Sequence, residues 1–174
     1  GESSPSGHLP FTVARNADDY PAFDREAAVA HYDLWHGYGK FQNEGLAPRF
    51  PFGFGMSYTH FDFRAVKARI DERGDIIVQV SVRNSGDTAG ATVVQVYVSP
   101  PNTVIQRWPR LLKAFRRLEL GPQQQQTVEL MVRRDAISYW DDSVSHWAFE
   151  PGDYRFEVGE SSDPASLIGC VLPL

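Results

Sequence analysis

Residues 76–86 read IIVQVSVRNSG, and Ile or Val occupies every second position up to Val82. The intervening residues include Gln79, Ser81 and Arg83, so one face of the segment is apolar and the other is mostly polar. Because side chains alternate between the two faces of a strand, this pattern predicts a half-buried β-strand. The Asn-Ser-Gly sequence at its end has turn chemistry and stops the strand.

Similar segments occur along most of the chain. Val94, Val96 and Val98 repeat the alternation before a Ser-Pro-Pro stop, and the segment 111–120 ends at a Gly-Pro pair. The expected strands begin at Phe61 and continue with residues 76–82, 94–98, 111–120, 128–132, 154–158 and 168–172. About seven short strands with regular turns are typical of a two-sheet sandwich. We therefore predict an all-β fold of immunoglobulin or fibronectin type III kind.

Two connections between these strands have local signals of their own. The segment Asp135–Trp140 predicts one capped helical turn. The sequence Glu150–Asp153 has Pro and Gly at the positions that a type II turn favours.

The N-terminal third has a different texture. Residues 1–53 lack sustained periodicity and are dense in Pro, Gly, Asp and aromatic residues. His8–Val13 is compatible with one short strand, and Asp24–Ala30 with a brief helix that needs packing to be stable. A loop-like stretch of this length is unusual inside a compact domain. We expect residues 1–53 to form an arm and linker that packs on something else, followed by a sandwich domain at 54–174.

Composition excludes several classes of protein. The formal net charge is −5 with a pI near 5.5, whereas nucleic-acid binding favours a basic surface. The single cysteine, Cys170, excludes an internal disulfide and a cysteine-based zinc site. No apolar run approaches the roughly 20 residues that span a bilayer. We predict no cofactor, no metal and neither a nucleic-acid nor a membrane partner; for the compartment, the cytoplasm is slightly favoured over the periplasm or secretion.

Residues with catalytic chemistry do not form a recognisable pattern. The carboxylates Asp141, Asp142, Glu150 and Asp153 gather near two predicted turns, where each has a turn role. The five histidines lack a metal-ligand spacing, and no Gly-x-Ser-x-Gly elbow occurs. We therefore predict no catalytic residue in this chain.

Aromatic residues on the arm are the remaining candidates for ligand contact. Tyr32, Trp35, Tyr38 and Phe41 lie within ten residues. Rings of this kind stack on sugars or anchor a segment on a neighbouring domain, and anchoring is favoured. Trp35, His36 and Tyr38 are the candidate substrate-binding residues.

The junction Arg49–Phe61, RFPFGFGMSYTHF, closely resembles a junction motif of glycoside hydrolase family 3, the β-glucosidase and β-xylosidase family. Pro5–Thr12 resembles the closing strand of that family's α/β sandwich domain, and Tyr32–Tyr38 resembles its linker. Gly39 stands where many members have Arg, so no role of that Arg is carried over. Further matches to its fibronectin type III-like domain occur at residues 94–98, 111–115, 138–141 and 150–154.

This resemblance implies an accessory role. Members are retaining hydrolases whose Asp nucleophile and carboxylic acid–base lie on preceding domains, so no residue here inherits a catalytic role. The resemblance implies a non-catalytic, stabilising module that packs on the catalytic domains of a β-glucosidase-like parent, in the same chain or a partner chain. Two alternatives stay open: a stand-alone carbohydrate-binding sandwich, and a protein-interaction sandwich such as a subunit of a split hydrolase.

Overall fold

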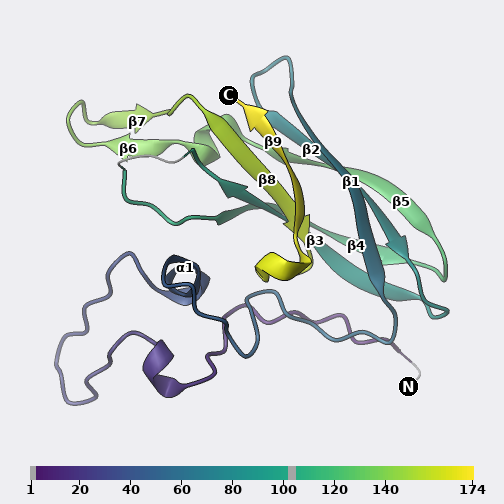
Figure 1. Ribbon diagram of the computed structural model, residues 1–174, viewed down its shortest axis with the longest axis horizontal. Coiled ribbons are helices and arrows are strands. Elements are labelled where there is room, and N and C mark those ends of the chain that lie inside the picture. The colour runs from purple at the N-terminus through teal and green to yellow at the C-terminus, as the bar shows by residue number, and fades with distance from the viewer. Residues whose placement is uncertain (1–2, 102–104) are drawn as a thin grey trace.

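The computed structural model describes residues 3–101 and 105–174. Two antiparallel sheets pack face to face, with the N-terminal arm running along one side (Figure 1). One sheet has the order β1-β2-β5, with β1 at Phe61–Ile70, β2 at Ile76–Asn84 and β5 at Gln125–Val132. The other has the order β4-β3-β8-β9, with β3 at Gly90–Ser99, β4 at Leu111–Leu120, β8 at Asp153–Gly159 and β9 at Ile168–Pro173. The predicted all-β sandwich is confirmed.

Alternating apolar residues build the core as the sequence predicts. Ile76, Val78, Val80 and Val82 of β2 have no exposed surface. Their partners in the register with β5 include Val128, opposite Val80. Rows from β3 and β8 close the core from the second sheet, with Val94, Val96, Val98, Tyr154, Phe156 and Val158. Burial of these aliphatic and aromatic groups is the main term that holds the two sheets together.

The connection between β5 and β8 contains an additional hairpin. A 3-10 helix, η2, covers Arg134–Ile137, and two short strands follow, β6 at Tyr139–Asp141 and β7 at His146–Ala148. The predicted helical turn at Asp135–Trp140 is therefore right for its first half and wrong for Tyr139 and Trp140. A further 3-10 helix, η3, lies at Pro164–Ser166.

The expected type II turn at Glu150–Asp153 is wrong. Gly152 has a φ of 150°, whereas a type II turn requires a φ near +80° at its second corner. Its backbone N–H and C=O instead pair with Leu174, at 3.0 Å each. The chain end therefore holds this segment in an extended conformation.

The arm contains little regular structure, and its helix lies elsewhere than expected. Asp24–Ala30 is exposed and forms only a turn, because a helix this short needs burial of one face to be stable. The 3-10 helix η1 lies at Ala17–Asp19, and the α-helix α1 covers Gly37–Asn43, which buries Phe41. The predicted strand His8–Val13 is reduced to isolated bridges, to Gly55 and Phe50.

The arm packs on the sandwich of its own chain. Gln95 and Tyr97 point away from the core on β3, yet their exposed fractions are 4% and 0%. The ring of Tyr38 lies 6.1 Å from that of Tyr97, and the backbone N–H of Ser162 donates to the carbonyl of Phe52 at 2.8 Å. The outer face of the second sheet is thus an inner layer of the molecule, which explains why β3 is buried on both faces.

Candidate functional site

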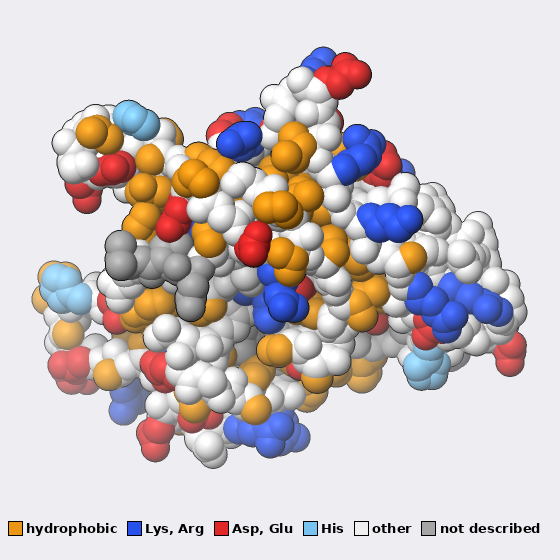
Figure 2. Space-filling model, turned by 45° about the horizontal axis from the view of Figure 1, so that its top comes forward, with side chains coloured by type: hydrophobic (Ala, Val, Ile, Leu, Met, Phe, Trp, Pro, Cys, Tyr) orange, Lys and Arg blue, Asp and Glu red, His pale blue; other side chains and the backbone are white. Residues whose placement is uncertain are grey.

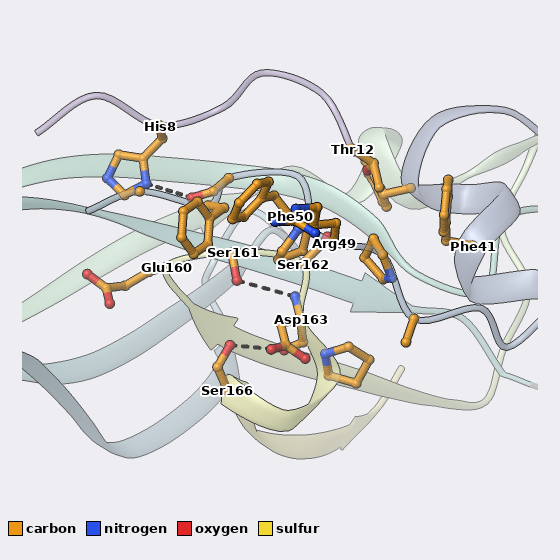
Figure 3. Close-up of a pocket in the computed structure, with 18 of the residues that line it drawn as sticks. His8, Thr12, Phe41, Arg49, Phe50, Glu160, Ser161, Ser162, Asp163 and Ser166 are labelled. Atoms are coloured by element: carbon orange, nitrogen blue, oxygen red, sulfur yellow. Dashed lines mark hydrogen bonds between the residues drawn. The ribbon is translucent and has the colours of Figure 1, made fainter. Parts of the chain in front are cut away.

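A groove of about 1220 Å³ lies between the arm and the second sheet. The arm contributes His8, Thr12 and Phe41 to its walls, and the connection after β8 contributes Glu160 and Ser161 (Figure 3). The volume is somewhat above the roughly 300–1,000 Å³ of typical small-molecule sites, so the groove is large enough to hold a ligand.

The polar groups of the groove mostly hold its walls together. Nδ1 of His8 lies 2.6 Å from the carbonyl oxygen of Gly53, which requires Nδ1 to carry the hydrogen. The backbone N–H of Asp163 donates to Oγ of Ser161 at 3.3 Å, and Oγ of Ser166 donates to the carbonyl of Asp163 at 3.0 Å (Figure 3). The carboxylate of Glu160 accepts from the hydroxyl of Thr92. Each of these contacts connects two parts of the groove wall and so contributes to its structure.

Three side chains in the groove have buried polar atoms without a partner in the described part of the chain. They are Oγ1 of Thr12, whose residue is 5% exposed, both amide atoms of Gln42, and Nη1 of Arg110. A buried polar atom without a hydrogen bond costs about 1–3 kcal/mol, so this end of the groove favours a polar occupant.

Tyr38 is the best-enclosed of the three predicted substrate-binding residues. Its ring lies 5.1 Å from that of Phe52 and 5.0 Å from that of Trp108. Its hydroxyl accepts a hydrogen bond from the backbone N–H of Leu112 at 3.0 Å. Burial raises the pKa of Tyr38, and the Leu112 hydrogen bond opposes this in part. These contacts anchor the arm on the second sheet.

Trp35 and His36 lie at the start of α1. The half-buried Trp35 donates its backbone N–H to the carboxylate of Asp33 at 2.7 Å. The exposed ring of His36 packs edge-to-face on Trp108, at 5.4 Å between centroids. The structure therefore brings His36 and Tyr38 to one ring, that of Trp108, while contact of all three candidates with substrate stays a prediction.

Trp108 is the residue that sequence reasoning missed. Its Nε1 donates to the carbonyl of Leu34 at 2.6 Å, and its ring covers Gly39. A Cβ at position 39 would stand 2.4 Å from Cδ2 of the indole. The signal in the sequence was Gly39 itself, because a position without a side chain leaves room for a large ring such as that of Trp108.

Among the carboxylates near the hairpin, Asp141 and Asp142 lie at or in its turn as expected, whereas Glu150 and Asp153 lack the turn role expected of them. The Ser143 hydroxyl, and secondarily its backbone N–H, lower the pKa of Asp141 by hydrogen bonding. Glu150 forms an ion pair with Arg107. Asp142 is exposed in the hairpin turn, and Asp153 is exposed opposite Pro173 at the start of β8.

Within residues 3–101 and 105–174, no group of three or more His, Cys, Asp and Glu side chains is placed to hold a metal ion. No helix in the same ranges has the length and apolar character needed to span a membrane.

Comparison with known proteins identifies the sandwich. The fibronectin type III-like domain family matches residues 92–162. The chain carries a fibronectin type III-like domain. The probable β-glucosidase I of Aspergillus clavatus is 35% identical over 176 residues, covering 94% of this chain and 21% of that protein. A β-glucosidase of Bacteroides ovatus is 32% identical over 93% of this chain and 23% of its own length.

Solved structures extend the match to the arm. The crystal structure of the Bifidobacterium adolescentis GH3 β-glucosidase has a TM-score of 0.90 at 30% identity, covering 100% of this chain and 26% of that one. The β-D-glucoside glucohydrolase of Trichoderma reesei has a TM-score of 0.88 at 29% identity, covering 99% and 27%. Over most of its length, the chain matches the C-terminal portion of family 3 β-glucosidases. It spans about one fifth to one quarter of the length of these relatives.

Proposed function

We propose that this chain is a non-catalytic module of a retaining β-glycosidase of β-glucosidase type, and that it stabilises the catalytic domains by packing on them. Residues 1–53 are the arm and linker that finish the preceding α/β domain, and residues 54–174 are the fibronectin type III-like domain. The observation that carries this proposal is the coverage: the match extends over nearly all of this chain but only about a quarter of the enzymes it resembles.

The arm supports the proposal because one of its sides packs on the sandwich while the other exposes apolar side chains. One side is anchored on the sandwich through Tyr38. The other side leaves apolar side chains in solvent, with Phe11 56%, Phe23 64% and Tyr32 66% exposed. Exposed apolar side chains gathered on one segment mark an interaction surface.

The unpartnered polar atoms of Thr12 and Gln42 also support the proposal. A docked polypeptide supplies backbone N–H and C=O groups that satisfy them, whereas an apolar partner does not. The remaining polypeptide of a longer parent is a partner with that chemistry.

The experiment has two steps. An antibody raised against this chain first measures the size of the native polypeptide, which we expect to be several times larger than 19.6 kDa and to co-purify with aryl-β-glucosidase activity. The parent is then expressed with and without residues 1–174. We expect the shortened parent to be less soluble on expression or to have a lower melting temperature. Full retention of both activity and melting temperature contradicts the proposal.

A matched control separates the module's role from a general sensitivity of the parent. Phe115→Ala in the full-length parent removes a ring that is 71% exposed on β4 and does not line the groove. We expect this variant to keep the activity and melting temperature of the parent.

A further inference from the structure

Two consecutive residues, Arg107 and Trp108, hold two separate parts of the molecule. Arg107 forms an ion pair with Glu150, and its guanidinium carbon lies 5.7 Å from the ring centroid of Tyr139 on β6. Trp108 donates to the carbonyl of Leu34 in the arm at 2.6 Å. The β6–β7 hairpin and the arm are therefore fixed relative to one another through a single short segment.

The hairpin presents a pair of tryptophans to solvent. Trp140 and Trp147 are direct partners in the β6–β7 register, with ring centroids 5.8 Å apart in an edge-to-face arrangement at 79°. They are 49% and 65% exposed. Because neighbouring residues of a strand point to opposite faces, Tyr139 faces Arg107 while the two indoles point away from it.

The base of the hairpin is well supported. The ring of Phe149 stacks on that of Tyr154 at 5.4 Å and 13°, and Arg134 lies 4.2 Å over the centroid of Phe149. The hydroxyl of Tyr154 donates to the carbonyl of Glu150 at 2.9 Å. The two exposed indoles are thus held in place before any partner arrives, which lowers the entropy lost on binding.

The loop of the arm at residues 20–34, called the arm loop below, carries exposed apolar side chains and lies at the same end of the molecule as the β6–β7 hairpin (Figure 1). Phe23, Tyr32 and Leu34 are 64%, 66% and 41% exposed. The loop and the β6–β7 hairpin both project at one end of the long axis (Figure 1), and the space-filling view shows hydrophobic side chains on both projections (Figure 2). The outer face of the first sheet differs, because it presents the polar residues Gln79, Ser81, Arg83, Thr127 and Glu129.

We propose that Trp140 and Trp147, together with the apolar side chains of the arm loop, form one composite docking face for the catalytic body of the parent polypeptide. This inference rests on the proposed function and adds a second point of attachment, since Trp140 lies 87 positions beyond the end of the arm at residue 53. The occupant follows from the lengths: the relatives contain roughly four times as much chain as the part matched here. Tryptophan is the side chain most often found at the energetic centre of such interfaces.

Oxidative footprinting of the four tryptophans tests the inference directly. In the isolated chain, Trp140 and Trp147 should oxidise faster than Trp35 and Trp108, in keeping with their exposure. In the full-length parent, we expect oxidation of both hairpin tryptophans to slow by about tenfold, because the core of an interface is closed to solvent. Phe115 should keep the same rate in both proteins. Equal rates for Trp140 and Trp147 in the two proteins overturn the inference.

Substitution gives a second readout. Trp140→Ala with Trp147→Ala should lower the melting temperature of the full-length parent far more than that of the isolated chain, because the partner surface exists only in the parent. Equal losses in both overturn the inference, since they mark the indoles as internal supports of the hairpin. Phe115→Ala is the matched control.

A sugar-binding role is the competing outcome and uses the same measurement. If millimolar cellohexaose protects Trp140 and Trp147 in the isolated chain, the pair is a carbohydrate platform and the docking assignment is wrong. The outcomes for the two proposals differ: a native polypeptide near 19.6 kDa removes the proposed function, whereas a long parent with freely oxidised hairpin tryptophans removes only this inference.

Discussion

The indole of Trp108 lies against the backbone of Gly39 so closely that a Cβ at position 39 would stand 2.4 Å from its Cδ2 and 2.6 Å from its Cε2. The two residues come from different parts of the molecule, Gly39 from α1 in the arm and Trp108 from the connection before β4. Trp108 also contacts the rings of His36 and Tyr38. This contact is therefore a main attachment of the arm to the sandwich.

Gly39→Ala should destabilise the arm. In a solvent-exposed helix, Ala is favoured over Gly by about 1 kcal/mol, so a stabilising effect would be the ordinary expectation. Here the new methyl group meets a packed ring, and overpacking of this kind costs about 1–3 kcal/mol. Urea unfolding should report a loss of stability, and limited proteolysis should cut the arm faster.

Two controls identify the cause. Gly7→Ala, where no atom lies within 4 Å of the added methyl, should have little effect. In a Trp108→Ala background, Gly39→Ala should lose most of its cost or become stabilising. An equal cost in both backgrounds would show that the Trp108 ring is not responsible.

Asn84→Asp should be strongly destabilising at neutral pH. The Asn84 side chain has no exposed surface and donates to the carbonyls of Thr88 at 2.8 Å and Leu120 at 3.1 Å. Its oxygen accepts from the Thr59 hydroxyl and from the backbone N–H of Gly86. A carboxylate at this position faces two carbonyl oxygens with no hydrogen to donate, at a cost of about 3 kcal/mol or more.

The pH dependence of Asn84→Asp has a definite sign. Burial and the two carbonyls raise the pKa of the new carboxyl above its unfolded value of about 4. The stability of the variant is then closest to that of the unchanged chain at acid pH. Its loss of stability grows as the pH rises through the pKa of the carboxyl in the unfolded chain. Urea unfolding at a series of pH values from acid to neutral measures this loss of stability, and Asn43→Asp at an exposed position is the control. A deficit that does not change with pH contradicts this account.

The main sheets were predictable because their signal is local. Ile76 to Val82 alternate strictly, and a period of two read over seven residues is enough to orient a strand and its buried face. The β6–β7 hairpin escaped because its strands are three residues long, too short to establish a period. Trp140 was assigned to a helical turn for the same reason.

The arm was not predictable from local signals, since long-range contacts determine it. Helix α1 contains Gly37 and Gly39, which disfavour a helix by propensity. It forms where Phe41 is buried and where Trp108, 69 positions after Gly39 in the sequence, covers the backbone. The candidate substrate-binding residues His36 and Tyr38 share a contact with Trp108, and that common partner could be found only in three dimensions.

Glu157→Gln should cost far more than the same change at Glu119. Glu157 of β8 accepts from Nε of Arg110 at 2.8 Å, and the two side chains are only 10% and 16% exposed. Glu157→Gln leaves the Arg110 guanidinium buried without its counterion, at a cost of about 3–5 kcal/mol. Glu119 pairs with Arg117 at the surface, where a pair contributes about 0–1 kcal/mol. Urea unfolding of the two variants gives the comparison, and similar small losses would show that the Arg110 pair is not important for stability.

Stability should fall steeply in alkali because three phenols are protected from water. Burial is the main cause that raises the pKa of Tyr38, Tyr97 and Tyr154 above the ordinary value of 10.0. Below that value the phenols are neutral in both states, so stability is unaffected. Above it the unfolded chain ionises while the folded chain holds these phenols neutral, and folding is progressively disfavoured.

Absorbance at 295 nm, combined with unfolding measurements from neutral pH upward, follows this process. The phenols of Tyr38, Tyr97 and Tyr154 should ionise only as the chain unfolds, because burial raises their pKa in the folded protein. Tyr97→Phe loses the hydrogen bond from its hydroxyl to Gln95, at 2.6 Å, and should be less stable at neutral pH but show a shallower alkaline decline. Tyr32→Phe should leave that decline unchanged. If Tyr38, Tyr97 and Tyr154 ionise near the ordinary value with the fold intact, the enclosure of Tyr38 and Tyr97 between the arm and the second sheet is wrong.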